Sequence, residues 1–214
     1  MLATLRVTLL AVVAAGMALA MPITPTQADA VSTSSSQVSC KPLAAGQWTL
    51  RLERQQLQGL WLSPMKQNGA RLAAVTRVGK DGQKLTFSSC ESKYMGLQNS
   101  KSAEGDFYGQ LKTERGTCLT RTKSTTENAA QWNFVAKPCP VSDDAEIENT
   151  FWRLTKSAKN GLTYDNTNYV ISPASESNGK KKFGFNFRAK TGVLFAGEPK
   201  PETSDLILYR SQNL

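Results

Sequence analysis

The sequence predicts an all-β domain, because turn signals separate many short strand-like segments and no segment has the periodicity of a helix. Apolar and polar residues alternate in segments such as Trp48–Leu52 and Phe183–Phe187. No stretch places apolar residues at positions i, i+3, i+4 and i+7 over three helical turns. Short strands at this spacing are typical of a β-sandwich or a β-barrel. Between the strands lie dipeptides that accept the positive φ angles of tight hairpins: Asn68-Gly69, Asp81-Gly82, Asn160-Gly161 and Asn178-Gly179.

The first 38 residues are expected to lie outside this domain. Arg6 is followed by an apolar run of about 14 residues, which is shorter than the roughly 20 residues of a membrane span. Ala18-Leu19-Ala20 is a small-x-small sequence of the kind that signal peptidase cleaves, and Ala28-Asp29-Ala30 leaves a second cleavage site open. We therefore expect residues 1–20 to be a signal peptide and the protein to be secreted. Residues 21–38, rich in Ser, Thr and Pro, predict a disordered lead-in, and residues 39–214 a single domain.

The charge composition narrows the classes of function. The chain has 214 residues, with 26 Lys+Arg against 17 Asp+Glu, a net charge of +9 and no histidine. The lack of histidine excludes Ser-His-Asp and Cys-His catalytic arrangements and histidine-ligated zinc. We therefore expect no enzyme activity and no cofactor. Export and the lack of an aromatic-basic motif argue against nucleic acid as a partner.

Four cysteines are expected to form two disulfides. Cys40, Cys90, Cys118 and Cys139 are an even number in an exported chain, and exported proteins fold in an oxidising compartment. No C-x-x-C pair or histidine accompanies them, which argues against a metal site. Four cysteines allow three pairings.

A repeated pattern of about 50 residues divides the domain into three expected units. Each copy has a Gly-led strand, a strand with a central phenylalanine and a further apolar or aromatic strand. Phe87, Phe134 and Phe187 mark the central strands of the three copies.

The middle copy carries a motif. It contains Gly116-Thr117-Cys118-Leu119, then Cys139, then Thr150-Phe151-Trp152-Arg153-Leu154. This order resembles the repeat of the ricin-B-type β-trefoil lectins, with Thr150 in place of a glutamine. The resemblance implies a β-trefoil of three units, carbohydrate binding, and a Cys118–Cys139 bridge within the middle unit, which leaves Cys40 to pair with Cys90. In that family the residue after Cys-Leu is often a sugar-binding Asp, whereas this chain has Thr120, so we expect the binding site in another unit.

The third unit offers the best constellation for a sugar. Tyr164, Asp165 and Asn166 combine an aromatic ring, an acceptor and an amide just after a turn. Trp132, at the edge of a strand, is a further candidate for stacking against a sugar. Trp61 lies in an apolar strand, as does Trp152, and both are expected in the core.

Two charged stretches have simpler interpretations. Asp143-Asp144-Ala145-Glu146-Ile147-Glu148 is expected to be a solvated loop, because consecutive carboxylates do not flank a glycosidic bond from two sides. Lys180-Lys181-Lys182 is either a solvated turn or a contact for an anionic polysaccharide through residues such as Lys181.

The sequence therefore favours a secreted, non-enzymatic lectin-like protein that binds a glycan or glycoprotein. The alternative is a secreted Kunitz-like β-trefoil protease inhibitor, with residues 197–201 as the loop that enters a protease. A glycan array and an inhibition assay against a protease panel separate the two. The sequence does not predict the particular sugar or the oligomeric state.

Overall fold

The prediction of an all-β domain is confirmed by the computed structural model. The structure describes residues 36–51, 57–76, 80–97, 106–124, 131–156, 167–174, 184–198 and 204–214. These residues form antiparallel strands and one short 3-10 helix, with no α-helix among them.

The elements follow one another along the described chain in this order: β1 (Ser39–Arg51), β2 (Leu57–Gln67), β3 (Ala70–Val75), β4 (Lys84–Glu91), β5 (Asp106–Thr113), β6 (Thr117–Lys123), β7 (Trp132–Pro138), η3 (Ala145–Asn149), β8 (Phe151–Lys156), β9 (Thr167–Pro173), β10 (Gly184–Phe187), β11 (Leu194–Gly197) and β12 (Asp205–Asn213).

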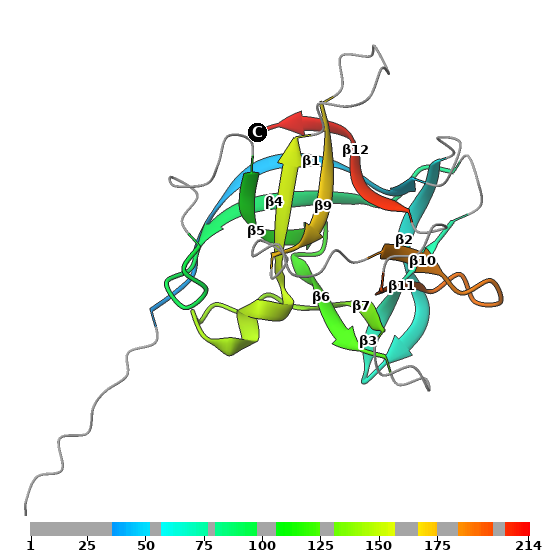
Figure 1. Ribbon diagram of the computed structural model, residues 1–214, viewed down its shortest axis with the longest axis horizontal. Helices are drawn as coiled ribbons and strands as arrows, with labels where there is room; N and C mark the ends of the chain where they lie inside the picture. The colour runs from blue at the N-terminus through cyan, green and yellow to red at the C-terminus, as the bar shows by residue number, and fades with distance from the viewer. Residues whose placement is uncertain are drawn as a thin grey trace, which may run out of the picture. The chain divides into compact units, whose positions relative to one another are not determined.

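Six of these strands pair in a closed ring (Figure 1). β1 pairs with β4, β4 with β5, and β5 with β8. The ring continues from β8 to β9 and β12, and β12 pairs with β1 again. Every pairing is antiparallel. A closed ring leaves no unpaired edge at which another chain could add a strand, and it encloses an apolar interior.

The other six strands form three hairpins, β2–β3, β6–β7 and β10–β11. The first hairpin turns at Asn68-Gly69, where both residues have positive φ, 49° and 79°, so this predicted turn is confirmed. One apolar residue from each hairpin meets the others in a small cluster of Leu72, Val135 and Val193. The three hairpins are therefore packed together as well as attached to the ring.

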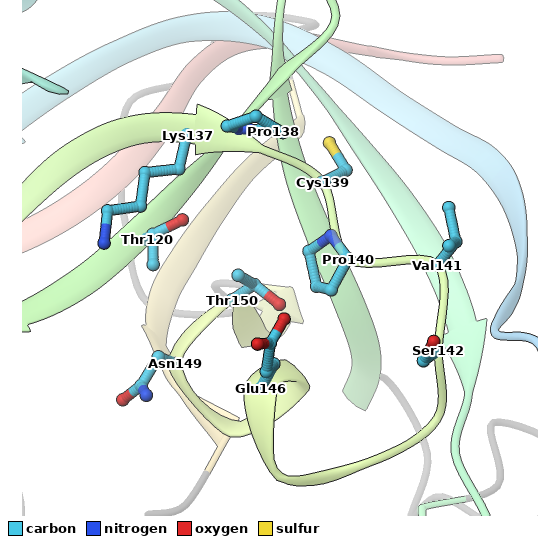
Figure 2. A pocket seen from close by; sticks show the side chains of 10 residues that line it. All are labelled: Thr120, Lys137, Pro138, Cys139, Pro140, Val141, Ser142, Glu146, Asn149 and Thr150. Atoms are coloured by element: carbon cyan, nitrogen blue, oxygen red, sulfur yellow. The ribbon is translucent and has the colours of Figure 1, made fainter. Parts of the chain in front are cut away.

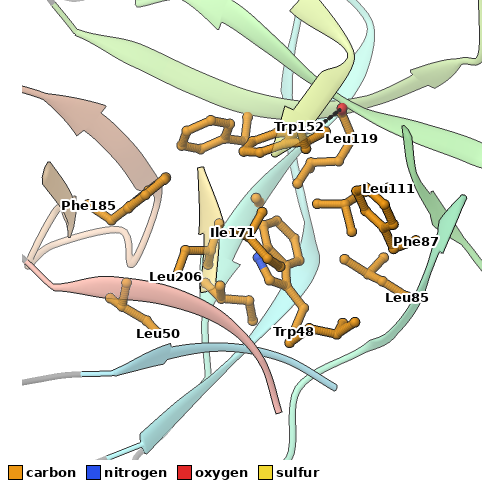
Figure 3. Packing of buried hydrophobic residues seen from close by; sticks show 14 of the residues in the cluster. Trp48, Leu50, Leu85, Phe87, Leu111, Leu119, Trp152, Ile171, Phe185 and Leu206 are labelled. Carbon is orange, nitrogen blue, oxygen red and sulfur yellow. Dashed lines mark hydrogen bonds between the residues drawn. The ribbon is translucent and has the colours of Figure 1, made fainter. Parts of the chain in front are cut away.

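The main core is built from the inner faces of ring strands and from apolar residues of the three hairpins, such as Leu60, Leu119 and Phe185 (Figure 3). Trp48 and Trp152 are its largest fully buried side chains. The Trp152 Nε1 donates to the Leu119 carbonyl at 2.9 Å, which joins β8 to β6. Trp152 is thus in the core as expected, whereas the expectation for Trp61 is wrong. Trp61 is 42% exposed, because its side chain points away from the buried Leu60 and Leu62 on the same strand.

The cysteines pair as the resemblance implied. Cys40 is bonded to Cys90, and Cys118 to Cys139. The first bridge joins neighbouring strands of the ring, since Cys40 and Cys90 are partners in the β1–β4 ladder. The second joins β6 to the residue that follows β7.

The folded domain begins slightly before the expected boundary at residue 39. Gln37 forms a β-bridge with Ser142, and the Val38 amide donates to the Val141 carbonyl at 2.9 Å. Residues 36–38 therefore belong to the folded domain rather than to the lead-in.

The phenylalanines that marked the repeat occupy different places in the fold. Phe87 lies in β4, a strand of the ring, whereas Phe134 lies in β7 and Phe187 in β10, which belong to hairpins. The alignment of the three copies on these residues is therefore wrong. All three sit in apolar strand patterns, and such a pattern does not distinguish a ring strand from a hairpin strand.

A buried polar network connects the three hairpins. Asn133 on β7 donates through Nδ2 to the Gln67 Oε1 at 2.7 Å and accepts from the Arg188 Nη1 at 2.9 Å. Gln67 ends β2, and Arg188 follows β10. Gln67 also donates to the Lys123 carbonyl at 2.7 Å. Burial lowers the pKa of the Arg188 guanidinium.

Asn133→Ala is expected to destabilise the domain by about 1–3 kcal/mol, because it removes the donor to the buried Gln67 Oε1 and one of several hydrogen bonds of the half-buried Arg188. The measurement is the urea midpoint at constant m. Asn186→Ala is the matched control, since Asn186 is only partly buried and accepts from the amide of the next residue. Equal losses in the two variants would contradict a special role for the network.

Candidate functional site

A pocket of about 450 Å³ lies beside the Cys118–Cys139 disulfide (Figure 2). Its size is in the range of small-molecule sites. Six polar residues contribute to its wall: Thr120, Lys137, Ser142, Glu146, Asn149 and Thr150.

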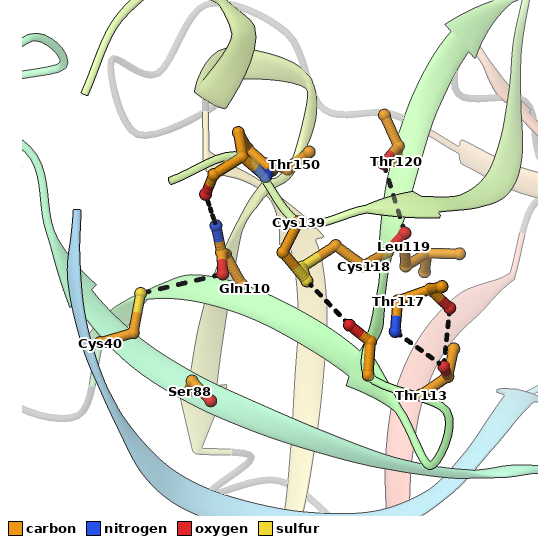
Figure 4. The surroundings of a disulfide bond; sticks show 12 residues. Cys40, Ser88, Gln110, Thr113, Thr117, Cys118, Leu119, Thr120, Cys139 and Thr150 are labelled. Atoms are coloured by element: carbon orange, nitrogen blue, oxygen red, sulfur yellow. Dashed lines mark hydrogen bonds between the residues drawn. A yellow bond between two sulfur atoms is a disulfide. The ribbon is translucent and has the colours of Figure 1, made fainter. Parts of the chain in front are cut away.

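The elements β6, β7 and η3 supply four of these six residues, and Ser142 and Thr150 lie on either side of η3. Thr120 comes from β6, Lys137 from β7, and Glu146 from η3. The bond from Cys118 to Cys139 ties β6 to the segment that leaves β7 and forms one side of the pocket (Figure 4). Gln110, on the ring strand β5, attaches the same segment to the ring, because its Nε2 donates to the Pro140 carbonyl at 3.2 Å.

The short helix η3 presents Glu146 and Asn149 to the pocket. The Asp144 carboxylate accepts from the Glu146 amide at 2.9 Å and caps the start of the helix. Ile147 is fully buried and anchors the helix against a second apolar cluster that contains Phe151. With Ile147 turned inward, Glu146 stays exposed and Asn149 half-buried at the pocket.

Asp143 has a structural part in the same region. Burial alone would raise the pKa of its carboxyl, but hydrogen bonds from the Ser92 hydroxyl and from the Lys93 and Tyr94 amides outweigh this, so the pKa is lowered. The Ser36 hydroxyl also donates to it. The acidic stretch is therefore more than a solvated loop, because Asp143 and Asp144 organise the backbone around the pocket.

The pocket offers complementary hydrogen-bonding groups. Lys137 supplies a cationic donor, Glu146 an anionic acceptor, and Asn149 both a donor and an acceptor. Among the described lining residues Glu146 is the only carboxylate, so they provide no pair of acids across a bond. The described residues also contain no group of His, Cys, Asp or Glu that could hold a metal ion. The arrangement suits a small ligand with several hydroxyl groups.

Only one of the binding residues expected from the sequence, Trp132, belongs to the described part of the chain. Tyr164, Asp165, Asn166 and Lys181 fall outside the described residues, so their placement stays a prediction. Trp132 begins β7, five residues before Lys137. The Arg121 guanidinium lies 5.4 Å from the centroid of its ring and covers one face of it.

Sequence reasoning missed Glu146 and Asn149 as site residues. The position after Cys-Leu, Thr120, does line the pocket. The carboxylate that was expected at that position is supplied instead by Glu146, which is 26 residues further along the chain. The loss of an acid at one position therefore did not exclude a site in the middle of the chain.

No protein-family profile matches this chain, and a comparison with curated proteins finds no similar sequence. In the part of the chain that the structure describes, no helix is long and apolar enough to cross a membrane.

Proposed function

We propose that the domain is a β-trefoil made of three four-stranded units, β1–β4, β5–β8 and β9–β12. The support is the pairing pattern. In each group the first and fourth strands pair in the ring and the second and third form a hairpin. The units divide the chain differently from the alignment on phenylalanines. Their first strands begin at Ser39, Asp106 and Thr167, 67 and 61 residues apart, so the units recur at a longer spacing than the 50 or so residues of that alignment.

The protein is, in this proposal, a secreted, non-enzymatic carbohydrate-binding protein of the ricin-B type, and the pocket beside Cys118–Cys139 is its site. The observation that carries the proposal is a small polar pocket lined by Thr120, Glu146 and Asn149. Sugar hydroxyls pair with such carboxylates and amides. Two further features agree with the motif, namely the Cys118–Cys139 bond and the contact of Trp152 with Leu119.

Glu146→Gln and Asn149→Ala are expected to weaken binding to the best glycan of an array by about 10- to 100-fold, the usual cost of losing one polar partner. The melting temperature should change little, because Glu146 is exposed and Asn149 half-buried. Glu114→Gln is the matched control, since Glu114 is an exposed carboxylate in the β5–β6 turn.

The same assay tests the third-unit prediction. If Asp165→Ala abolishes binding and Glu146→Gln does not, the site lies in the third unit and the pocket is not the lectin site. If no glycan binds and the protein inhibits members of a protease panel, the lectin function is wrong and the Kunitz-like alternative stands.

A further inference from the structure

The outer wall of the ring carries three cations, on β4, β5 and β12, with polar residues between them. Lys84 on β4 pairs with Gln47 on β1, and Gln47 pairs with Tyr209 on β12. Directly paired residues of an antiparallel sheet point to the same face. Leu85 and Leu111 are buried inside, so Lys84 and Lys112, next to them in sequence, face outward.

Lys112 extends this surface to a fourth strand. It lies on β5 opposite Thr86, which is two residues after Lys84 and therefore on the same face. From β12 through β1 and β4 to β5 (Figure 1), the wall spans three strand spacings, or about 14 Å. Arg210 stands at one end of this span and Lys112 at the other.

Arg210 is held in an unusual backbone conformation. Its φ is 48°, and among the described non-glycine residues only Asn68, in a hairpin turn, shares a positive φ. It occupies a bulge, since β12 has one residue more than β1 between the Gln47–Tyr209 and Ala45–Gln212 pairs. Glycine is the residue that fits such a position without strain. An arginine there indicates that the side chain is used.

The bulge directs the Arg210 side chain across the wall. Its guanidinium lies 5.3 Å from the centroid of the Tyr209 ring and 3.8 Å from the Asp81 carboxylate. Both members of this ion pair are more than half exposed, so the pair contributes little and an anionic ligand can compete with Asp81. Glu114, in the turn after β5, is a second acid near the wall.

We propose that this wall, formed by Arg210, Tyr209, Gln47, Lys84, Thr86 and Lys112, docks a sulfated polysaccharide. Sulfate groups pair with the three cations, and sugar hydroxyls meet the hydroxyl groups of Tyr209 and Thr86 between them. The net charge, +9 for the whole chain and +8 once Arg6 is removed with residues 1–20, attracts a polyanion over a longer range. None of the six wall residues lines the pocket, and the proposal does not depend on the lectin site. The choice of a polysaccharide over a nucleic acid as the polyanion rests on the secretion proposed above.

The test compares two triple variants that each remove three positive charges. Lys84→Gln/Lys112→Gln/Arg210→Gln alters the wall, and Lys66→Gln/Lys93→Gln/Lys190→Gln alters exposed lysines elsewhere. For heparin, the wall variant is expected to bind at least about 10-fold more weakly and to lower the slope of log K against log salt by about two to three, as fewer counterions are released. The control is expected to lose about 2-fold or less.

Single variants keep the proposal testable if the triple variant unfolds. Arg210→Gly suits the backbone of the bulge, so it should melt no lower than the unaltered protein yet bind heparin several-fold more weakly. Asp81→Asn should bind more tightly. Equal losses in both triple variants, equal binding of desulfated heparin, or equal binding of single-stranded DNA through the same residues would each overturn the proposal. None of these results bears on the pocket.

Discussion

Gly82→Ala is expected to destabilise the domain by about 3 kcal/mol, because overpacking forces the backbone to move. A Cβ atom at Gly82 would lie 1.8 Å from the Trp48 carbonyl oxygen and 2.9 Å from the Leu60 amide nitrogen. Both are backbone atoms of ring and hairpin strands, which cannot shift as a flexible side chain would. The backbone at Trp48 is also fixed by a hydrogen bond, because its amide donates to the Gln83 carbonyl at 3.0 Å. Guanidinium denaturation measures the loss.

Gly197→Ala is the control for this prediction. There the nearest atom to an added Cβ is the Gln131 Cγ at 3.6 Å, an ordinary contact. The substitution should change the free energy of unfolding by less than about 1 kcal/mol. A Gly82→Ala variant as stable as Gly197→Ala would show that the segment before β4 packs less closely against Trp48 than the structure indicates.

Gly82 also shows what a local signal can and cannot predict. Asp81-Gly82 was expected to be a tight hairpin turn, because such dipeptides accept positive φ. In the structure Gly82 is not among the described glycines with positive φ, and its lack of a side chain serves close approach to Trp48. Asn68-Gly69, by contrast, is a turn with positive φ at both residues. Such a dipeptide indicates a position that requires glycine. Whether the reason is a positive φ, as at Gly69, or close backbone packing, as at Gly82, depends on the tertiary structure.

The strands themselves could be predicted, but their closure into a ring could not. Alternation in the Leu85–Phe87 segment reflects one buried face, which is a local property. The pairing of β1 with β12 joins residues over 150 positions apart, and no local pattern contains that information. For the same reason Phe87 and Phe134 looked equivalent although they lie in strands of different kinds.

The pocket was missed because its acid comes from a different segment than the motif. Thr120 was compared with the family at one position, where an Asp is common. Glu146 lay in a stretch interpreted as a solvated loop, and nothing local shows that Ile147 turns inward and fixes η3 against Phe151. The presence of Ile147, a large apolar residue between two glutamates, is the signal in the sequence that could have found it.

Loss of either disulfide is expected to destabilise the domain strongly. The bridges close loops with separations of 50 and 21 residues. In the chain-entropy account, removing Cys40–Cys90 costs about 4 kcal/mol and removing Cys118–Cys139 about 3 kcal/mol. The measurement is urea denaturation of the double variants Cys40→Ser/Cys90→Ser and Cys118→Ser/Cys139→Ser.

Glycan binding should be affected in the reverse order: Cys118→Ser/Cys139→Ser should lose more affinity than Cys40→Ser/Cys90→Ser, although it loses less stability. Cys118–Cys139 joins β6, which carries Thr120, to the segment that forms a side of the pocket, so its loss should weaken binding by at least about 10-fold even where the variant is fully folded. Cys40–Cys90 lies in the β1–β4 ladder and contributes nothing to the described pocket wall. Its loss should lower stability more and leave the affinity of the folded protein within about 2-fold. Equal binding by the two variants at a temperature where both are folded would show that the pocket keeps its shape without its own disulfide.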